Sequence, residues 1–141
     1  ISNENLSKLQ ENLVKSHACG TGEEVPIEIV RLMLLLKIQS LSYGYSGVRL
    51  STVLRLIDFY NNGILPVIYT QGSLGASGDL APLAHLSLPL LGEGEVYVDG
   101  FRQPASKVLA KSTNSLRISS QPFNLKDFSY FVSTIQEYSG Y

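Results

Sequence analysis

Hydrophobic residues recur at helical spacing near the start of the chain. Polar residues fill the positions between them, so that one face of a helix would be apolar and the others polar or charged. This pattern predicts an amphipathic helix from about residue 3 to residue 16. Its apolar positions are Leu6, Leu9, Leu13 and Val14.

The segment from residue 26 to about residue 43 is apolar on almost every face of a helix. Pro26 suits the first position of a helix, and Glu28 places a negative charge in the opening turn. Gly44 follows as a C-terminal stop. Because a surface helix has a polar face, we expect this helix to lie at the centre of a bundle.

A third helix is predicted over residues 48–61, with Gly63 ending it. Residues 64–70, interrupted by Pro66, are predicted to be extended. The apolar face of the predicted third helix is made of Leu50, Val53, Leu54 and Ile57.

The strongest turn signal is the dipeptide Asp99-Gly100, which stands between two short β-prone runs. Asp and Gly tolerate the positive φ angles that a two-residue turn requires, so residues 95–103 are predicted to form a hairpin. The elements together predict a mainly α fold: a fragment of a helical bundle with one small β-hairpin.

Composition and charge exclude several function classes. A length of 141 residues suits one domain, and a net charge of −1 favours neither nucleic acid nor an anionic membrane as a partner. Two separated histidines and the lone Cys19 match no metal-ligand spacing, so we expect no metal. A single cysteine and the lack of a visible signal segment lead us to expect a soluble, cytoplasmic protein.

The chemistry of the chain is concentrated in the run GSLGASGDLAPLAH, from Gly72 to His85. If the amide nitrogen of Gly78 attacks the carbonyl carbon of Ala76, a five-membered ring closes around Ser77. Loss of two water molecules then leaves a conjugated imidazolone, whose exocyclic methylene comes from the Ser77 side chain. Gly78 has no Cβ to block the approach, and the small Ala76 leaves its carbonyl accessible. In the simpler alternative, the run is a glycine-rich turn in which Ser77 has no chemical role.

The residues after this trio predict a helix that begins next to it. Asp79 is a favourable N-cap, and residues 80–91 are apolar, with Pro82 tolerated in the first turn. The N-terminus of a helix carries roughly half a positive charge, which would stabilise negative charge that develops on the ring.

At these residues the chain resembles the aromatic amino-acid ammonia-lyases and aminomutases. The run from Gly72 to His85 is similar to their signature, the block from Gln10 to Gly20 is similar to their N-terminal helix and loop, and residues 44–49 (GYSGVR) are similar to their mid-domain turn. The resemblance covers roughly residues 6 to 109.

The resemblance implies a 4-methylidene-imidazol-5-one prosthetic group made from Ala76, Ser77 and Gly78, which would be the catalytic residues. It places Ser16 and His17 at the pocket for the substrate side chain, where members that act on histidine tend to have Ser-His. The implied reaction is elimination of ammonia from L-histidine to give urocanate. A tyrosine or phenylalanine ammonia-lyase, an aminomutase and a non-catalytic fragment of such an enzyme remain alternatives.

The resemblance also implies what lies outside this chain. Family members are tetramers of much longer chains, so we expect a homo-oligomer. Residues 1–109 would be part of the N-terminal catalytic domain, and residues 110–141 are an unassigned tail. The family's catalytic base and carboxylate-binding arginine fall outside the aligned region, so this chain alone is expected to be inactive.

Three other residues invite a functional interpretation. His85 lies on an otherwise apolar helix, and we expect a core histidine whose ring is hydrogen-bonded rather than a ligand or base. Arg49 is expected in a structural ion pair, and Cys19 in a packing role. For His17, the alternative to a pocket role is a histidine at the end of a helix, facing its dipole or solvent.

Overall fold

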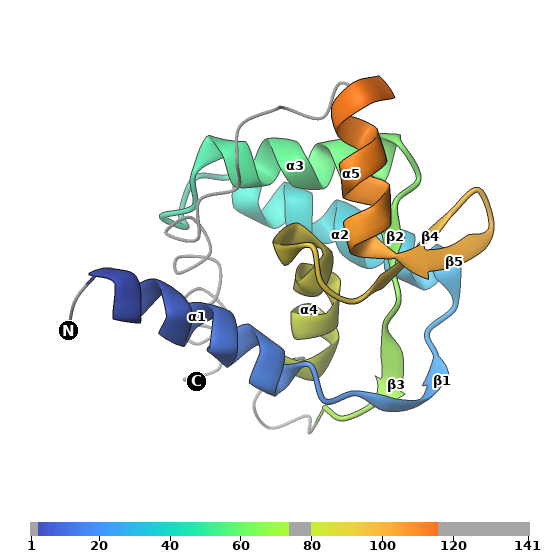
Figure 1. The fold of residues 1–141 in the computed structure, drawn as a ribbon, viewed down its shortest axis with the longest axis horizontal. Coiled ribbons are helices and arrows are strands. Elements are labelled where there is room, and N and C mark those ends of the chain that lie inside the picture. Colours follow the sequence, from blue (N-terminus) through green and yellow to red (C-terminus); the bar gives the residue numbers. More distant parts are fainter. Residues whose placement is uncertain (1–2, 74–79, 116–141) are drawn as a thin grey trace.

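The computed structural model describes residues 3–73 and 80–115. The predicted first helix is confirmed as α1 (Asn3–His17). Val14 on its apolar face is buried. α1 runs along one side of the molecule and contacts α4 (Leu80–Ser87), which stands between α1 and the other helices (Figure 1). Lys15 pairs with Glu11 of the same helix and with the distant Glu93.

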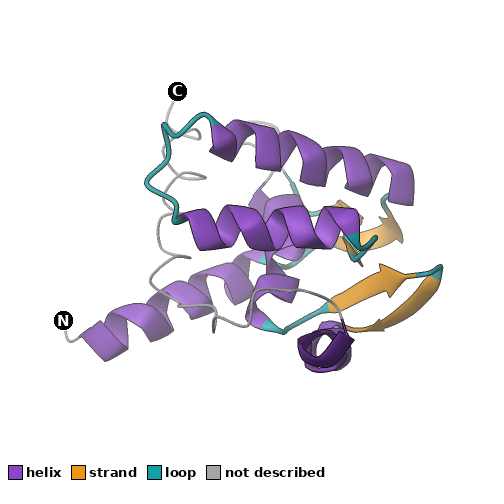
Figure 2. Ribbon diagram, turned by 90° about the horizontal axis from the view of Figure 1, so that it is seen from above, coloured by secondary structure: helices purple, strands orange, loops and turns teal. Residues whose placement is uncertain are grey.

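The predicted second helix is confirmed as α2 (Ile27–Ser42), with Pro26 at its N-cap. Gly44 ends it at a φ of +75°, where its amide donates to the carbonyl of Leu41. α2 runs beside α3 (Leu50–Asn61), and a loop joins their ends (Figure 2).

The prediction that α2 lies at the centre of a bundle is wrong for the described part of the chain. α2 buries Val30, Leu34 and Leu41 but leaves four large apolar side chains 42–53% exposed. The physical reason is that α3 and β2 (Leu65–Pro66) are the elements that contact α2 most, which leaves its outer face uncovered. The exposed side chains are Ile29, Leu32, Leu35 and Leu36.

The third helix is confirmed, but its predicted buried face is only partly correct. Val53 is buried, whereas Leu50 is 72% exposed and Leu54 is 44% exposed. The buried residues Thr52, Leu56 and Phe59 define the face that packs inward. Apolar residues cover a broad arc of this helix, so its own pattern did not determine which part of the arc would face α2.

The predicted hairpin is confirmed as β4 (Glu95–Val98) and β5 (Phe101–Pro104). Both turn residues have positive φ, +52° at Asp99 and +78° at Gly100. β2 pairs antiparallel with β4, which extends the hairpin to a three-stranded sheet in the order β2-β4-β5. The predicted extended segment is therefore confirmed, and its first part is a strand of this sheet.

A second, two-stranded sheet joins β1 (Thr21–Glu24) to β3 (Tyr69–Gln71) in antiparallel register. β1 has no predicted counterpart in the sequence, because Gly and Glu are poor strand formers. It begins at the end of the loop after α1, and β3 ends just before the Ala76-Ser77-Gly78 trio. The pairing therefore brings together two of the three blocks of the family resemblance, the one that ends at Gly20 and the one that begins at Gly72 (Figure 1).

The helix predicted over residues 80–91 consists of two parts. α4 gives way to a 3₁₀ turn, η1 (Leu88–Leu91), because Pro89 cannot donate the hydrogen bond that an α-helix requires there. α5 (Ala105–Ser115) was not predicted, since its polar, Ser-rich end is typical of a linker. The mainly α fold with one small hairpin is confirmed.

Candidate functional site

The catalytic trio predicted from the sequence, Ala76, Ser77 and Gly78, lies outside the described residues, as does Asp79. The residues on either side of it are described. β3 leads into Gly72 and Ser73, and α4 begins at Leu80. These two flanks and the block that contains Ser16 and His17 are the described parts of the candidate site.

The two flanks of the trio lie against each other and against Gly20. Thr21 pairs with Gln71, which places the loop after α1 beside the end of β3. Gly72 has a φ of +127°, and a Cβ at this position would lie 2.9 Å from the Cα of Gly20 and 3.4 Å from the Cβ of Ala81. The end of β3, the loop after α1 and the start of α4 thus meet at the described residues on either side of the trio. Only glycine fits this close approach.

His85 joins the loop after α1 to α4. Its Nε2 accepts a hydrogen bond of 3.0 Å from the backbone amide of Gly20. The side chain is buried, and the ring of Tyr69 packs edge-on against it at 5.3 Å between centroids. Burial lowers the pKa of His85 below its ordinary value. The ring is therefore neutral with Nδ1 protonated, because Nε2 acts as the acceptor. The prediction of a hydrogen-bonded core histidine is confirmed.

Ser16 and His17 occupy the last turn of α1. Nδ1 of His17 lies 2.7 Å from the carbonyl oxygen of Leu13, and Oγ of Ser16 donates to the same oxygen at 2.8 Å. A carbonyl oxygen only accepts, so Nδ1 of His17 carries a proton, and in the neutral form of the ring Nε2 is then the acceptor. His17 does bond to the end of its own helix, as the alternative interpretation expects. That bond also sets the tautomer and leaves an acceptor nitrogen at the opposite edge of the ring.

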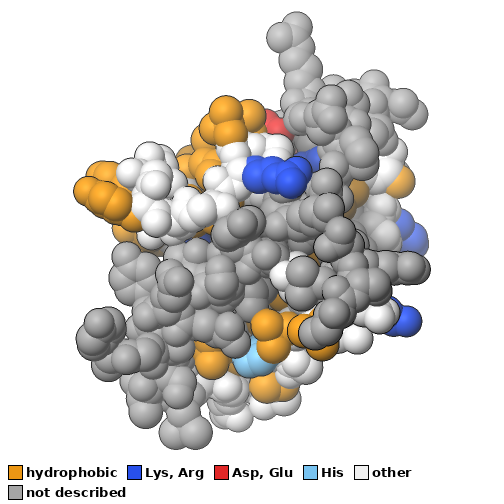
Figure 3. Space-filling model, turned by 90° about the vertical axis from the view of Figure 1, so that its left-hand side faces the viewer, with side chains coloured by type: hydrophobic (Ala, Val, Ile, Leu, Met, Phe, Trp, Pro, Cys, Tyr) orange, Lys and Arg blue, Asp and Glu red, His pale blue; other side chains and the backbone are white. Residues whose placement is uncertain are grey.

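A histidine side chain reaches the surface low on the face drawn in Figure 3, among hydrophobic side chains. Of the histidines, His17 is half-buried and His85 is buried.

A polar cluster that was not predicted from the sequence binds the hydroxyl of Tyr69. Arg102 of β5 bonds to Glu24 of β1 and to Glu95 of β4, and its Nη2 donates to the hydroxyl of Tyr69 at 3.2 Å. The hydroxyl of Tyr97 donates to Glu24 at 2.9 Å. The Arg102 hydrogen bond lowers the pKa of Glu95. The cluster ties both sheets to the residue that packs on His85.

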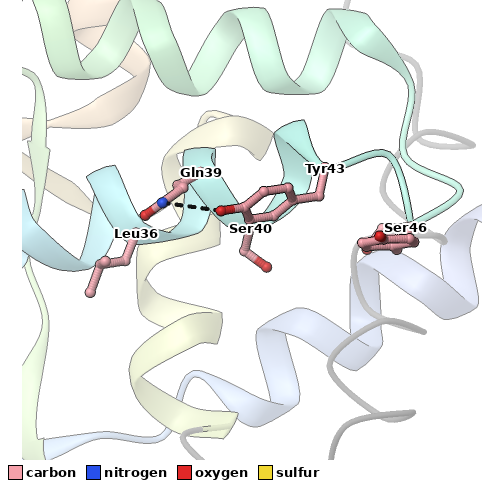
Figure 4. A pocket seen from close by; sticks show the side chains of 6 residues that line it. Leu36, Gln39, Ser40, Tyr43 and Ser46 are labelled. Carbon is pink, nitrogen blue, oxygen red and sulfur yellow. Dashed lines mark hydrogen bonds between the residues drawn. The ribbon is translucent and has the colours of Figure 1, made fainter.

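A separate pocket lies at the C-terminal end of α2, where Gln39 donates to the hydroxyl of Tyr43 at 3.3 Å (Figure 4). Neither Ser16 nor His17 lines it, and it is distinct from the site around Gly20. Its lining residues are Leu36, Gln39, Ser40, Tyr43, Tyr45 and Ser46.

Within residues 3–73 and 80–115, no group of three or more His, Cys, Asp or Glu side chains could hold a metal ion. None of the helices in the same ranges combines the length and the apolar character needed to cross a bilayer.

Comparison with known proteins places these features in a family context. A family model described as aromatic amino acid lyase matches residues 1–122. Histidine ammonia-lyase of Legionella pneumophila (strain Corby) is 60% identical over 100 residues, which are 71% of this chain and 20% of that protein. The chain thus spans about a fifth of the length of the curated relatives it matches.

Solved structures show the same relationship. The crystal structure of histidine ammonia-lyase from Trypanosoma cruzi superposes with a TM-score of 0.72 at 39% identity, over 78% of this chain and 22% of that one. Tyrosine aminomutase from Streptomyces globisporus superposes with a TM-score of 0.69 at 38% identity, over 76% of this chain and 20% of that one.

Proposed function

This chain belongs to the aromatic amino acid lyase family, and on that premise we propose that the full-length protein eliminates ammonia from L-histidine to give urocanate. The identity with a histidine ammonia-lyase supports this substrate, as does the Ser16-His17 pair at the end of α1. The observation that carries the proposal is the meeting of Gly20, Gly72 and Ala81 at the two flanks of the trio.

The surroundings fit a prosthetic group made from the chain itself. Ring closure joins the amide nitrogen of Gly78 to the carbonyl carbon of Ala76, and two water molecules leave, one of them with the Ser77 hydroxyl. Such a closure requires a compressed backbone, which persists only where the surrounding structure enforces it. The close contact of Gly20 with Gly72 supports this requirement, because it fixes the entry to the trio. We propose 4-methylidene-imidazol-5-one as the group.

When present, this group would supply an electron-poor carbon to which the substrate amine can add, and a conjugated ring that accepts the electron pair of the carbon–nitrogen bond when the amine leaves. The chain's own residues have other tasks. The N-terminus of α4, at Leu80, carries partial positive charge toward the residues before it, and this charge stabilises a developing anion there.

His17 and Ser16 would bind and orient the substrate side chain. With Nδ1 of His17 committed to Leu13, its Nε2 can accept a hydrogen bond from the N–H of a substrate imidazole. A phenyl ring has no such donor, so this arrangement favours histidine over phenylalanine. A phenol could still donate through its hydroxyl, and tyrosine is therefore the competing substrate that the assay must include.

The proposal is tested with the full-length protein and L-histidine. We expect release of ammonia, the ultraviolet absorbance of urocanate, and an intact mass lower than the sequence mass by two water molecules. Ser77→Ala should abolish the mass deficit and the activity together. Ser106→Ala, an exposed serine on α5, is the matched control and should change neither.

Each alternative has its own outcome in the same assay. Ammonia release from tyrosine or phenylalanine, but not from histidine, would assign the other lyase activity. Formation of a β-amino acid would indicate an aminomutase, to which the similarity with tyrosine aminomutase points. A wild-type protein with no mass deficit and no product would be a non-catalytic member.

We also propose that the protein is a cytoplasmic homotetramer. The exposed apolar side chains of α2 support burial of this helix against other parts of the assembly, because monomers rarely expose large apolar patches. Light scattering of the full-length protein measures the number of subunits, and a monomeric mass would contradict the proposal.

A further inference from the structure

We infer that His85 is a positioning residue for the substrate pocket: by accepting the amide of Gly20, it holds the Ser16-His17 end of α1 against the helix that follows the catalytic trio. This inference rests on the proposed function, since it assigns a role in substrate binding. His85 itself would not touch the substrate.

The geometry supports a fixed attachment rather than ordinary packing. The bond from Gly20 to Nε2 of His85 joins positions 65 residues apart. The ring cannot move away easily, because the side chain is buried and Tyr69 packs against it. It cannot move closer either, since the amide nitrogen of Gly20 already lies 3.0 Å from Nε2, the distance of a formed hydrogen bond.

Only two residues separate Gly20 from His17, so the position of one restrains the other. The amide of Ala18 donates to Val14 and the amide of Cys19 donates to His17, which makes this connection a continuation of the last turn of α1. α1 and α4 also contact each other directly. Displacement of Gly20 would therefore move the His17 ring. Small errors in the placement of a substrate-binding group cost much of its effect.

Two substitutions at His85 distinguish the effect of the hydrogen bond from the effect of the shape of the side chain. In His85→Leu the site remains filled, but the half-buried Gly20 amide loses its acceptor. In His85→Gln the amide oxygen can reach the region that Nε2 occupies and can accept the same bond. Ser87→Ala is the matched control, because Ser87 is buried on the same helix but bonds to Leu83 within it.

The first test measures steady-state kinetics of the full-length variants with L-histidine. For His85→Leu we expect the two-water mass deficit to remain and KM to rise about tenfold, the effect of one half-buried donor that loses its partner. His85→Gln should restore KM to within about threefold of the wild type. An unchanged KM in His85→Leu would overturn the inference, and so would a His85→Gln variant as impaired as His85→Leu.

The second test is a double-mutant cycle with His17, read as the Kd of urocanate so that turnover is not required. His85→Asn is used, because its shorter side chain remains polar but does not reach Gly20. If His85 acts through His17, this change should weaken urocanate binding in the wild type and alter it less than about twofold in His17→Leu. Equal losses in both backgrounds would show a merely structural role and overturn the inference.

The wild-type protein separates the two hypotheses. A wild type that releases no ammonia from L-histidine contradicts the proposed function. A wild type that is active on histidine, with additive effects of His17 and His85, contradicts the positioning role alone.

Discussion

Gly20 and Gly72 meet backbone to backbone: a Cβ on Gly72 would lie 2.9 Å from the Cα of Gly20. The contact follows from the pairing of Thr21 with Gln71, which aligns the loop after α1 with the end of β3. It brings the segment that carries His17 to the entrance of the segment that carries the trio. Glycine is required at both positions for different reasons: the Gly20 backbone blocks a Cβ on Gly72, whereas the His85 ring and the Gln71 carbonyl oxygen block a Cβ on Gly20.

Gly72→Ala tests this contact. The change adds a Cβ at a φ of +127° and against Gly20, so we expect a loss of about 2–4 kcal/mol in the free energy of unfolding. Gly44→Ala is the control, with a φ of +75° and no atom within 4 Å of the added Cβ. The midpoint of urea unfolding should be well below that of Gly44→Ala for the Gly72→Ala protein. Intact mass should show incomplete ring formation in Gly72→Ala only. Equal midpoints would contradict the close contact.

Gly20→Ala should destabilise the protein for a different reason. The φ of Gly20 is not in the positive range, but an added Cβ would lie 2.9 Å from Nε2 of His85 and 3.3 Å from the carbonyl oxygen of Gln71. We expect a loss of about 1–3 kcal/mol from overpacking. In a His85→Ala background the ring is absent, so the same change should cost less. Thermal unfolding of the four proteins in this cycle measures the difference, and strict additivity would count against the contact.

His85 should make stability depend on pH in a defined direction. Burial lowers its pKa in the folded state below the ordinary value of about 6.5, which the unfolded chain retains. As the pH falls through about 6.5, the unfolded chain therefore binds a proton that the folded chain does not yet bind. This contribution to stability is complete above about pH 6.5 and is lost as the pH falls toward the lowered pKa.

The melting temperature between about pH 5 and pH 7.5 measures this dependence. His85→Gln has no titrating group at this position and should show a shallower decline at the acidic end. A decline of the same steepness in both proteins would assign the dependence to other groups.

Thr52 on α3 offers a stabilising substitution. Its side chain is fully buried, and its Oγ1 has no hydrogen-bond partner among the described residues. A buried hydroxyl without a partner is unfavourable, so Thr52→Val should raise the free energy of unfolding by about 1 kcal/mol. Thr52→Ser is the control, because it keeps the hydroxyl and removes the methyl group, and it should destabilise. A Thr52→Val protein less stable than wild type would mean that the hydroxyl does have a partner.

Local signals predicted most of the elements. Gly44 ends α2 and the Asp99-Gly100 turn connects β4 to β5, as predicted. Both outcomes depend on φ angles that these residues themselves tolerate. β1 could not be predicted in this way, since Thr21–Glu24 becomes a strand only by pairing with β3. The polar end of α5 was equally misleading, because Ser, Thr and Asn are poor helix formers that a packed helix can still contain.

The same division between local and long-range contacts applies to the candidate site. His17 and Ser16 were named from the sequence, and their bonds to Leu13 are local contacts within one turn of helix. The partner of His85 was not predictable, because Gly20 lies 65 positions away. The cluster around Arg102 was not predictable for the same reason, since its acceptors come from three different strands.

By itself, the sequence determined the helical segments other than α5, their stops and the hairpin turn, and it contains the three neighbouring residues whose backbone can close into a ring. These properties depend on groups that are close along the chain. Only the tertiary structure decided which faces of α2 and α3 are buried, and that Gly20 lies between His85 and Gly72. Those outcomes depend on which distant surfaces pack together, and the periodicity of a single segment contains no information about its partner.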